Sequence, residues 1–354
     1  MNILEYMETH GHEQLCVFTD KGVGIRAFIA IHDTTLGPAL GGVRTWPYKS
    51  EDEALMDVLR LSRGMTYKSA AAGLNLGGGK AVIMANPQEK TEAMMRAFGQ
   101  FVESQGGRYI TTEDVGATTQ DMEWIAQETS HVTGLPVNQG GSGDPSVMTG
   151  YGVYQGMKAC AMEVWGTDSL EGRIIAIQGF GKVASYLVGH LLEEGARPIV
   201  TDINPAALKR AREQGLEVVE DPSAIYDVEC DIFSPCALGA ILNDGTIPRL
   251  KCKVVAGCAN NQLLEDSHAV ALRRRGILYA PDFIINAGGV INISLELGQP
   301  YDEEAALEKT AHIYDTVERV ISMAKTEGIT TAQAADRLVE ERIAAMRRVK
   351  GIYL

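Results

Sequence analysis

Two lysines and an aspartate stand where acid–base chemistry could be built. Lys80 directly follows three glycines, Lys68 precedes it, and Asp114 lies further along the chain. A lysine is a useful base near neutral pH only if burial or a neighbouring cation lowers its pKa. Residue type and spacing alone do not decide between this chemistry and ordinary surface positions. For Lys68 and Asp114 the simpler interpretations are a surface lysine and a turn acid.

The glycines before Lys80 do not form a nucleotide P-loop. That motif needs G-x-x-x-x-G-K-[ST], whereas Leu74 occupies the position of its first glycine and Ala81 that of its Ser or Thr. Three glycines remove side chains from around one lysine, so a small ligand could lie against the backbone there. From spacing alone, an exposed lysine on a glycine turn remains the alternative.

A dinucleotide-binding motif is better defined. Gly179, Gly181 and Ala184 make G-x-G-x-x-A between a buried-type strand at 173–178 and a helix that continues to Glu194. The first glycine permits a tight turn, the second lets the backbone approach a pyrophosphate, and the alanine lets the helix pack closely on the sheet. The helix N-terminus supplies N–H groups and the positive end of a dipole.

Asp202 indicates which dinucleotide would bind. It follows the next strand, 198–201, and lies 23 residues after Gly179, near the spacing of about 20 for an acid that binds ribose hydroxyls. A carboxylate there repels a 2′-phosphate, and the following Ile203-Asn204-Pro205 contains no arginine to bind one. We therefore predict NAD as the cofactor. The alternative is an aspartate that only caps a helix.

The elements that must position these residues alternate between strands and helices, which predicts an α/β fold with a parallel, doubly wound sheet. The main ones are strands at 25–32, 81–84, 173–178, 198–201, 229–233, 253–256 and 277–280, and helices at 91–104, 146–164 and 182–194. A further helix starts at a capping box formed by Ser50 and Glu53, and its regular pattern ends at Gly64. The tail from Glu303 predicts two helices broken near Gly328.

The composition excludes several classes of function. The 354 residues suffice for two domains, and a net charge of −14 disfavours nucleic-acid and anionic membrane partners. The six cysteines form no CxxC pair and no histidine completes a zinc spacing, so no metal site is predicted. The N-terminus does not resemble a signal peptide, and no apolar stretch approaches the roughly 20 residues of a membrane span. We expect a cytoplasmic protein.

Several segments together resemble the glutamate/leucine/phenylalanine/valine dehydrogenase family, in the family's order and across essentially the whole chain. They are 37–44 (GPALGGVR), 65–68 (MTYK), 77–80 (GGGK), 113–116 (EDVG), 234–237 (SPCA), 259–262 (ANNQ) and 286–290 (NAGGV). The segment 70–76 (AAAGLNL) is similar to the leucine dehydrogenase branch of that family.

The resemblance implies an amino-acid dehydrogenase in which an L-amino acid, NAD⁺ and water give a 2-oxo acid, ammonium and NADH. It assigns Lys68 to the substrate carboxylate, Lys80 to activating the water and polarising the developing carbonyl, and Asp114 to exchanging protons with the amino group. A closed cleft and the nearby Lys68 would then lower the pKa of Lys80.

The resemblance also implies two domains with a cleft between them. We expect an N-terminal α/β substrate domain over 1–134 and a Rossmann NAD-binding domain over 147–329. The Gly-, Pro-, Ser- and Asn-rich segment 134–146 between them would act as a hinge. The C-terminal helix, 330–354, is expected to pack back on the first domain.

Further residues are expected at the two binding sites. For the substrate they are Leu40, Gly41, Gly42, Met65, Thr112, Asn261, Val290 and Ile293. For NAD they are the motif with its acid, and loops matched by the resemblance: Thr149, Gly179, Phe180, Gly181, Lys182, Val183, Ala184, Asp202, Ile203, Cys236, Ala237, Ala259, Asn260, Asn261 and Asn286.

Leu40 indicates the class of substrate. In glutamate-specific members of the family a lysine at this position pairs with the substrate's side-chain carboxylate, which leucine cannot do. An unpaired carboxylate there would cost several kcal/mol, whereas an isobutyl group gains about 0.8 kcal/mol per buried CH₂. We therefore predict branched aliphatic substrates, L-leucine first, then isoleucine and valine. The glycines that flank Leu40 favour a ligand-facing position over a core position.

Two other functions agree less well with these residues. A phenylalanine or tryptophan dehydrogenase of the same family is disfavoured because Thr112 and Ile293 would crowd an aromatic ring, although they leave the order among aliphatic substrates open. A catalytically inactive NAD-binding or regulatory protein is disfavoured by the joint presence of Lys68, Lys80 and Asp114. Because the family forms homo-oligomers, we expect a homo-oligomer, with an octamer as one candidate.

Overall fold

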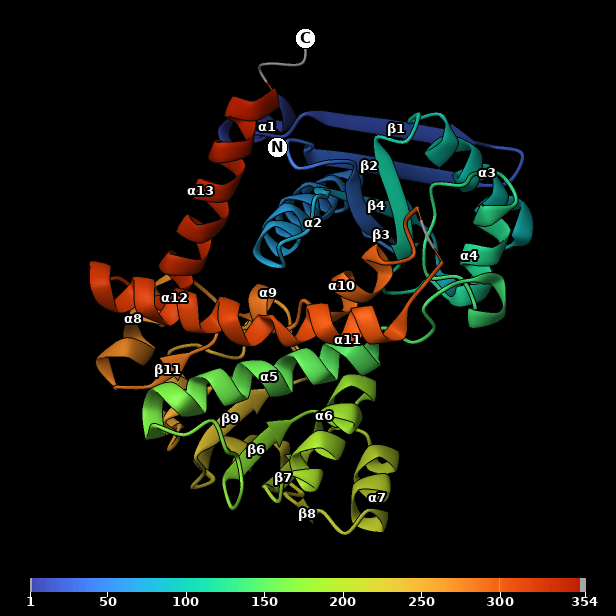
Figure 1. Ribbon diagram of the computed structural model, residues 1–354. Helices are drawn as coiled ribbons and strands as arrows, with labels where there is room; N and C mark the ends of the chain where they lie inside the picture. The colour runs from blue at the N-terminus through green and yellow to red at the C-terminus, as the bar shows by residue number, and fades with distance from the viewer. Residues whose placement is uncertain (1, 299, 351–354) are drawn as a thin grey trace. The chain divides into compact units, whose positions relative to one another are not determined.

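The computed structural model describes residues 2–298 and 300–350, which divide into two compact units (Figure 1). The first unit is built from Met1–Asp144, Ile293–Asp302 and Val339–Leu354, and the second from Pro145–Asn292 and Glu303–Leu338. The segment 293–302 therefore belongs to the first unit, although no sequence pattern pointed to it.

A five-stranded sheet organises the described residues of the first unit. Its strands are β1 (Gln14–Asp20), β2 (Ile25–Asp33), β3 (Ala39–Trp46), β4 (Gly77–Met84) and β5 (Tyr109–Glu113), in the order β1-β2-β4-β3-β5. The β1–β2 and β2–β4 pairs are antiparallel, whereas β3 runs parallel to both β4 and β5.

Helices cover both faces of this sheet because side chains alternate along each strand. Helix α2 (Glu51–Ala71) packs on β2 and β4, and its Val58 and Leu59 form a core with Phe28 and Val82. The other face carries a larger apolar cluster with α3 (Glu92–Glu103) and α4 (Thr119–Ala126). A short helix, α1 (Ile3–His10), precedes β1.

The last helix of the chain, α13 (Thr331–Lys350), contacts the first unit through its second half. The guanidinium of Arg347 donates to Asp33 Oδ2 at 2.6 Å, and that of Arg342 donates to the carbonyl oxygen of Ala70 at 2.6 Å. These contacts attach residues from the C-terminal end of the chain to β2 and to the end of α2.

The second unit contains the parallel, doubly wound sheet that the sequence predicts. Its strands are β6 (Ile174–Gln178), β7 (Arg197–Thr201), β8 (Glu217–Val218), β9 (Ile232–Pro235), β10 (Val254–Val255) and β11 (Leu278–Tyr279). They are parallel in the order β11-β10-β9-β6-β7-β8. The strand order reverses between β6 and β9, and doubly wound sheets bind their ligands at this point.

Helices connect and flank these strands. They are α5 (Ser146–Trp165), α6 (Lys182–Glu193), α7 (Pro205–Glu213), α8 (Ser267–Arg274), α9 (Asp282–Ile285), α10 (Gly288–Ser294), α11 (Glu303–Ala311) and α12 (Ile313–Glu327). The α/β fold class predicted from the sequence is confirmed.

Three local expectations were wrong. Helix α2 continues through Gly64 to Ala71, because buried Ser62 and Thr66 on either side of that glycine hold it against the sheet. The strand expected at 81–84 begins at Gly77, so the glycines before Lys80 lie inside β4. A Cβ on Gly78 would lie 2.1 Å from the Thr66 nitrogen, so glycine there lets α2 approach. The tail contains a further helix boundary at His312, in addition to the one at Gly328.

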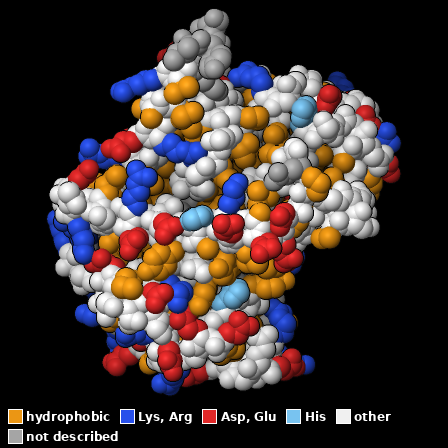
Figure 2. All heavy atoms as spheres, viewed as in Figure 1, with side chains coloured by type: hydrophobic (Ala, Val, Ile, Leu, Met, Phe, Trp, Pro, Cys, Tyr) orange, Lys and Arg blue, Asp and Glu red, His pale blue; other side chains and the backbone are white. Residues whose placement is uncertain are grey.

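Three further observations concern the surface charge, membrane-spanning helices and metal clusters of the described residues. On the face shown in Figure 2, acidic and basic side chains are interspersed, with apolar side chains between them. Among residues 2–298 and 300–350, no helix combines the length and apolar character that crossing a bilayer requires. The same residues contain no cluster of three His, Cys, Asp or Glu side chains that could hold a metal ion.

Candidate active site

Lys80 and Asp114 form a buried ion pair in the first unit. Lys80 lies in the middle of β4, paired with Ala30 of β2, and is only 5 % exposed. Asp114 directly follows β5, and its Oδ2 lies 3.0 Å from Lys80 Nζ. The fold thus brings together the two residues that the sequence analysis assigned to proton transfer.

The surroundings shift the pKa values of both groups. Burial lowers the pKa of the Lys80 amine, the negative charge of Asp114 opposes this, and the positive charge of Arg44 lowers it further. Burial alone would raise the pKa of Asp114, but the charges of Lys80 and Arg44 outweigh it and lower this pKa to about 2. Asp114 is therefore an anion at neutral pH, and Lys80 loses its proton more readily than an exposed lysine does.

Arg44 is a site residue that sequence reasoning missed. Its Nε lies 2.9 Å from Asp114 Oδ2, and its positive charge lowers the pKa of Lys80. The same effect expected of Lys68 stays a prediction. Lys68 lies on α2 and is partly buried. Arg44 is the last residue of the GPALGGVR segment, but its position in the sequence does not indicate that it contacts Asp114.

Several predicted substrate residues share the α2-covered face of the sheet with this pair. Leu40, Gly42 and Arg44 are every second residue of β3, so they face the same side of the sheet. Gly42 pairs with Thr112 of β5. Arg44 contacts Asp57 of α2, which identifies that side as the face that α2 covers.

Backbone packing explains the glycines beside Leu40. A Cβ on Gly41 would lie 1.7 Å from the Gly79 oxygen, and one on Gly42 would lie 2.5 Å from the Glu113 oxygen and 2.8 Å from Asp114 Cβ. Leu40 itself is 0 % exposed. The argument from the flanking glycines was therefore wrong: these glycines allow strands to approach each other, and Leu40 presents no open surface in this structure.

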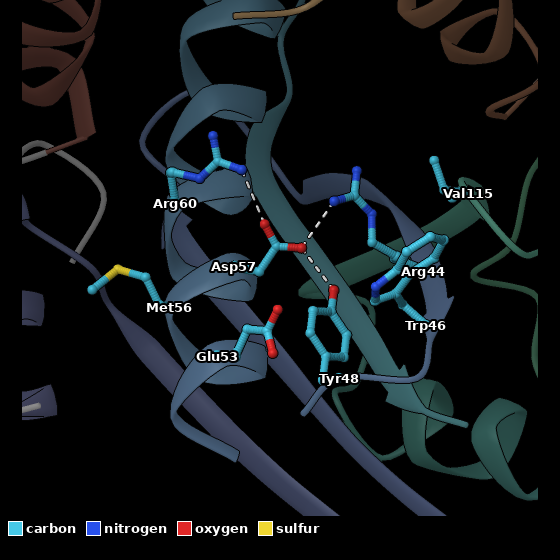
Figure 3. Close-up of a pocket in the computed structure, with 8 residues that line it drawn as sticks. All are labelled: Arg44, Trp46, Tyr48, Glu53, Met56, Asp57, Arg60 and Val115. Carbon is cyan, nitrogen blue, oxygen red and sulfur yellow. Dashed lines mark hydrogen bonds and ion pairs between the residues drawn. The ribbon is translucent and has the colours of Figure 1, made fainter. Parts of the chain in front are cut away.

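An open pocket of about 440 Å³ adjoins the far side of Arg44 (Figure 3). The side chains that line it come from β3, the segment after it, the first half of α2 and the residue after Asp114: Arg44, Trp46, Tyr48, Glu53, Met56, Asp57, Arg60 and Val115. Neither Lys80 nor Asp114 is among these lining residues. The pocket therefore gives access to the partners of the ion pair and not to the pair itself.

In the second unit, the predicted dinucleotide turn has the geometry that its motif requires. Gly179 has a φ of 99°, and a Cβ there would lie 2.7 Å from Ala237 Cβ, so only glycine fits. Gly181 is the N-cap of α6, and a Cβ on it would meet nothing within 4 Å. Lys182, Val183 and buried Ala184 form the first turn of the helix.

Asp202 is held beside this turn. Its Oδ2 accepts from the Phe180 N–H at 2.7 Å and its Oδ1 accepts from the Asn204 N–H at 2.7 Å. The Phe180 side chain is 0 % exposed, so only its backbone can face a ligand, whereas Ile203 is 85 % exposed. Arg210 of α7, which sequence reasoning also missed, donates to the Phe180 oxygen at 3.3 Å.

Asn286, which directly follows α9, binds the loop after β10. Its Nδ2 donates to the Cys258 oxygen at 3.0 Å and to Asn260 Oδ1 at 2.8 Å, while its buried Oδ1 has no hydrogen-bond partner among the described residues. Asn261 has a φ of 51°, unusual for a non-glycine residue.

The other predicted cofactor residues lie after β9, after β10 and at the start of α5. Cys236 and Ala237 directly follow β9, and the Ala259 N–H donates to the Pro235 oxygen at 2.9 Å. Thr149, in the first turn of α5, donates to the Pro145 oxygen at 2.9 Å. A Cβ on Gly289 would lie 2.8 Å from Thr149 Oγ1, so glycine there lets α10 approach α5.

Val290 and Ile293, both on α10, are buried, at 5 % and 7 % exposed. Ile293 belongs to the first unit and Val290 to the second. Across the whole set, the structure therefore gathers Lys80, Asp114, Leu40, Gly42 and Thr112 on one sheet of the first unit. The predicted cofactor residues lie in the second unit.

Two family models match this chain. A family model described as the dimerisation domain of Glu/Leu/Phe/Val dehydrogenases matches residues 12–131. A second, described as Glutamate/Leucine/Phenylalanine/Valine dehydrogenase, matches residues 140–208 and 200–351.

Individual relatives cover the whole chain. A leucine dehydrogenase of Geobacillus stearothermophilus is 57 % identical over 355 residues, which are 100 % of this chain and 96 % of that protein. A phenylalanine dehydrogenase of Caldalkalibacillus thermarum is 47 % identical, over 100 % and 97 % of the two chains. The crystal structure of L-tryptophan dehydrogenase from Nostoc punctiforme is similar with a TM-score of 0.85 at 46 % identity, over 98 % and 99 % of the chains. This chain therefore belongs to the glutamate/leucine/phenylalanine/valine dehydrogenase family of amino-acid dehydrogenases, as its sequence segments predict.

Proposed function

We propose that this enzyme catalyses the NAD⁺-dependent oxidative deamination of branched aliphatic L-amino acids, with L-leucine as its best substrate and isoleucine and valine as others. The products are a 2-oxo acid, ammonium, NADH and a proton. The observation that carries the proposal is the buried pair of Lys80 and Asp114, 3.0 Å apart, because deamination needs both a base for water and a proton carrier for the amino group.

The two residues take different roles because their charges differ. Burial and Arg44 favour the neutral form of Lys80, which then removes a proton from the attacking water. The protonated lysine, now a cation, stabilises the developing carbonyl oxygen. Asp114 is held as an anion, so it first accepts a proton from the substrate's amino group and later returns it to the leaving ammonia. Lys68 binds the substrate carboxylate.

The residues of the second unit fit a dinucleotide, which when bound accepts the hydride from the substrate's α-carbon. The open space at Gly181 leaves room for a pyrophosphate at the N-terminus of α6. A carboxylate can accept about four hydrogen bonds, so Asp202 retains acceptor sites for ribose hydroxyls beside its two backbone donors. The unpartnered Oδ1 of Asn286 suits a donor such as the nicotinamide's carboxamide.

The choice of substrate rests on apolar side chains and on relatives. The apolar side chains that we expect the substrate to contact are Leu40, Met65, Val290 and Ile293, and Thr112 would limit the size of that substrate. Leucine dehydrogenases of several bacilli are 55–57 % identical to this chain, against 47 % and 48 % for a phenylalanine and a tryptophan dehydrogenase. These identities favour leucine over aromatic substrates.

The proposal also includes the oligomeric state and the cellular location of the enzyme. A homo-oligomer is supported by the match of residues 12–131 to a model described as a dimerisation domain. We propose a cytoplasmic location, which suits an enzyme that draws on the cellular pool of NAD⁺ and amino acids.

A panel of L-amino acids assayed with NAD⁺ by NADH absorbance tests the proposed function. Leucine should give the highest kcat/KM, followed by isoleucine and valine, with glutamate far lower. A highest value for phenylalanine or tryptophan would replace the substrate assignment with the aromatic alternative. NADH formation from no amino acid in the panel would instead favour an inactive NAD-binding protein.

A further inference from the structure

Arg44 connects the Lys80–Asp114 pair to a second carboxylate. Its Nε lies 2.9 Å from Asp114 Oδ2. Its Nη1 lies 2.8 Å from Asp57 Oδ2, the contact drawn in Figure 3. The two contacts use different nitrogens of one planar guanidinium, which fixes its orientation as well as its position. Arg44 therefore bridges β3, the end of β5 and helix α2.

Asp57 is itself held in place. Tyr48 donates its hydroxyl to Asp57 Oδ2 at 2.7 Å, on the oxygen that Arg44 also contacts. Arg60, one turn along α2, donates to the other oxygen, Oδ1, at 3.0 Å. The chain of contacts thus runs from Lys80 through Asp114 and Arg44 to an aspartate with two further partners.

Charge and burial suggest why this arrangement is needed. The side chains of Lys80, Asp114, Arg44 and Asp57 are 6 %, 22 %, 22 % and 15 % exposed. Partly desolvated charges are costly unless their partners are well placed, and removing one partner leaves the others unpaired. In this group two cations and two anions alternate, so each carboxylate lies between two cations or hydrogen-bond donors.

We propose that Arg44 is a positioning residue for the deamination reaction: it aims the Asp114 carboxylate at Lys80, and Asp57 with Tyr48 holds Arg44 in the orientation that does so. This inference rests on the proposed function, because the proposed function assigns Lys80 and Asp114 their roles in catalysis. Arg44 acts through Asp114 and need not touch the substrate.

The effect of Arg44 on pH dependence has a definite sign. Lys80 acts as a base in its neutral form, so kcat/KM rises as the pH passes the pKa of Lys80. The positive charge of Arg44 lowers that pKa, so its removal should move the rise to higher pH. Other titratable groups on the elements around the pair stay unchanged in the comparison: His32, Asp33, Tyr48, Glu53, Asp57, Arg60, Lys68, Tyr109 and Glu113.

The first experiment compares two arginines that share Asp57. Arg44→Gln removes the charge that contacts Asp114, and it should lower kcat/KM for L-leucine by about tenfold or more near neutral pH and move the rise to higher pH. Arg44→Lys should lower kcat but move the rise less, because it keeps the charge and loses the two-nitrogen geometry. Arg60→Gln, the matched comparison, removes a cation that contacts Oδ1 of Asp57 and not Asp114, so it should lower the rate and move the pH profile much less than Arg44→Gln does.

The pocket beside Arg44 allows a second experiment. In Arg44→Ala the deleted guanidinium leaves a space that opens to the 440 Å³ pocket, so added guanidinium or ethylguanidinium should restore part of kcat. Equal concentrations of sodium chloride and of urea serve as controls for ionic strength and denaturation. Rescue that is specific to guanidinium supports a positioning role, since a misfolded variant would not recover.

One result overturns the inference and another overturns the proposed function, and the two are separable. The pKa of Lys80 can be measured without activity, from the pH dependence of its trace acetylation followed by peptide mass spectrometry. A folded Arg44→Gln enzyme with an unshifted Lys80 pKa, an unshifted pH profile and no guanidinium rescue of Arg44→Ala would overturn the role of Arg44. Absence of leucine-dependent NADH formation in the unchanged enzyme would overturn the proposed function, while the acetylation measurement would still test the effect of Arg44 on Lys80.

Discussion

Lys80 Nζ and Asp114 Oδ2 lie 3.0 Å apart although β3 separates their strands in the sheet. On the β5 side of β3 lies Gly42, where an added Cβ would lie 2.8 Å from Asp114 Cβ. The missing side chain lets β5 approach closely enough for the carboxylate to reach the lysine. Gly42 therefore contributes both to the packing of the sheet and to the placement of the Lys80–Asp114 pair.

Substituting this glycine should damage the enzyme, whereas the same change elsewhere should not. Gly42→Ala forces Glu113 and Asp114 away, and overpacking of this kind costs about 1–3 kcal/mol, with a fall in kcat because the ion pair lengthens. Gly64→Ala is the matched control: it lies on an exposed part of α2 with nothing within 4 Å, and should stabilise the helix by about 1 kcal/mol. Urea unfolding and leucine kinetics measure both; a Gly42→Ala enzyme with unchanged kinetics would contradict this account.

Asp114 should contribute to stability in a pH-dependent manner. Its pKa of about 2 lies below the ordinary 3.8, so its stabilising effect is complete above pH 4 and disappears as the pH falls through 2. The difference corresponds to about 2 kcal/mol. The free energy of unfolding should therefore fall more steeply between about pH 4 and about pH 2 in the unchanged enzyme than in Asp114→Asn. Parallel slopes would mean that Asp114 is not held as an anion by Lys80 and Arg44.

Asp202 should set the preference for the cofactor. NAD⁺ is expected to exceed NADP⁺ in kcat/KM by at least about tenfold, or about 1.4 kcal/mol, because the carboxylate repels a 2′-phosphate. Asp202→Ser should narrow this ratio, and Arg210, which contacts the same turn, would then be free to attract the phosphate. Equal kcat/KM for the two cofactors in the unchanged enzyme would contradict the role of Asp202.

Leu40→Lys tests whether this residue contacts the substrate. Because Leu40 is 0 % exposed, a lysine there buries an unpaired charge, which costs several kcal/mol, so both the melting temperature and the leucine activity should fall. A trace of glutamate activity would support direct contact with the substrate. Leu40→Met, which nearly conserves volume, should change stability by less than about 1.5 kcal/mol. Unchanged leucine kinetics in Leu40→Lys would show that the residue does not line the pocket.

Local patterns predicted the second unit well because its motif is short-range. The strand, the Gly179–Gly181 turn, the helix and the acid at Asp202 follow one another within one βαβ unit, so their spacing determines their arrangement. Phe180 was harder to assign, since its side chain turns into the core and leaves only backbone for a ligand.

The first unit was less predictable because its site is assembled from distant segments. Arg44, Asp57 and Asp114 meet only after β3, α2 and β5 have packed together, and no pattern along the chain records which carboxylate an arginine will reach. For the same reason spacing alone left a glycine turn before Lys80 open as an alternative: the close approach of α2 and of Tyr109, which requires these glycines, exists only in the assembled sheet. Resemblance to the family identified Lys80 and Asp114, but it did not supply Arg44.

The central claim is that Lys80 is the base in NAD⁺-dependent deamination of L-leucine, and its removal tests this most directly. Lys80→Ala should lower kcat, followed as NADH absorbance, by about 100-fold or more, while NADH binding followed by fluorescence stays intact. Asp114→Asn should lose a similar factor, whereas Lys68→Ala should act mainly through the KM for leucine. A Lys80→Ala enzyme with near-normal kcat would contradict the mechanism.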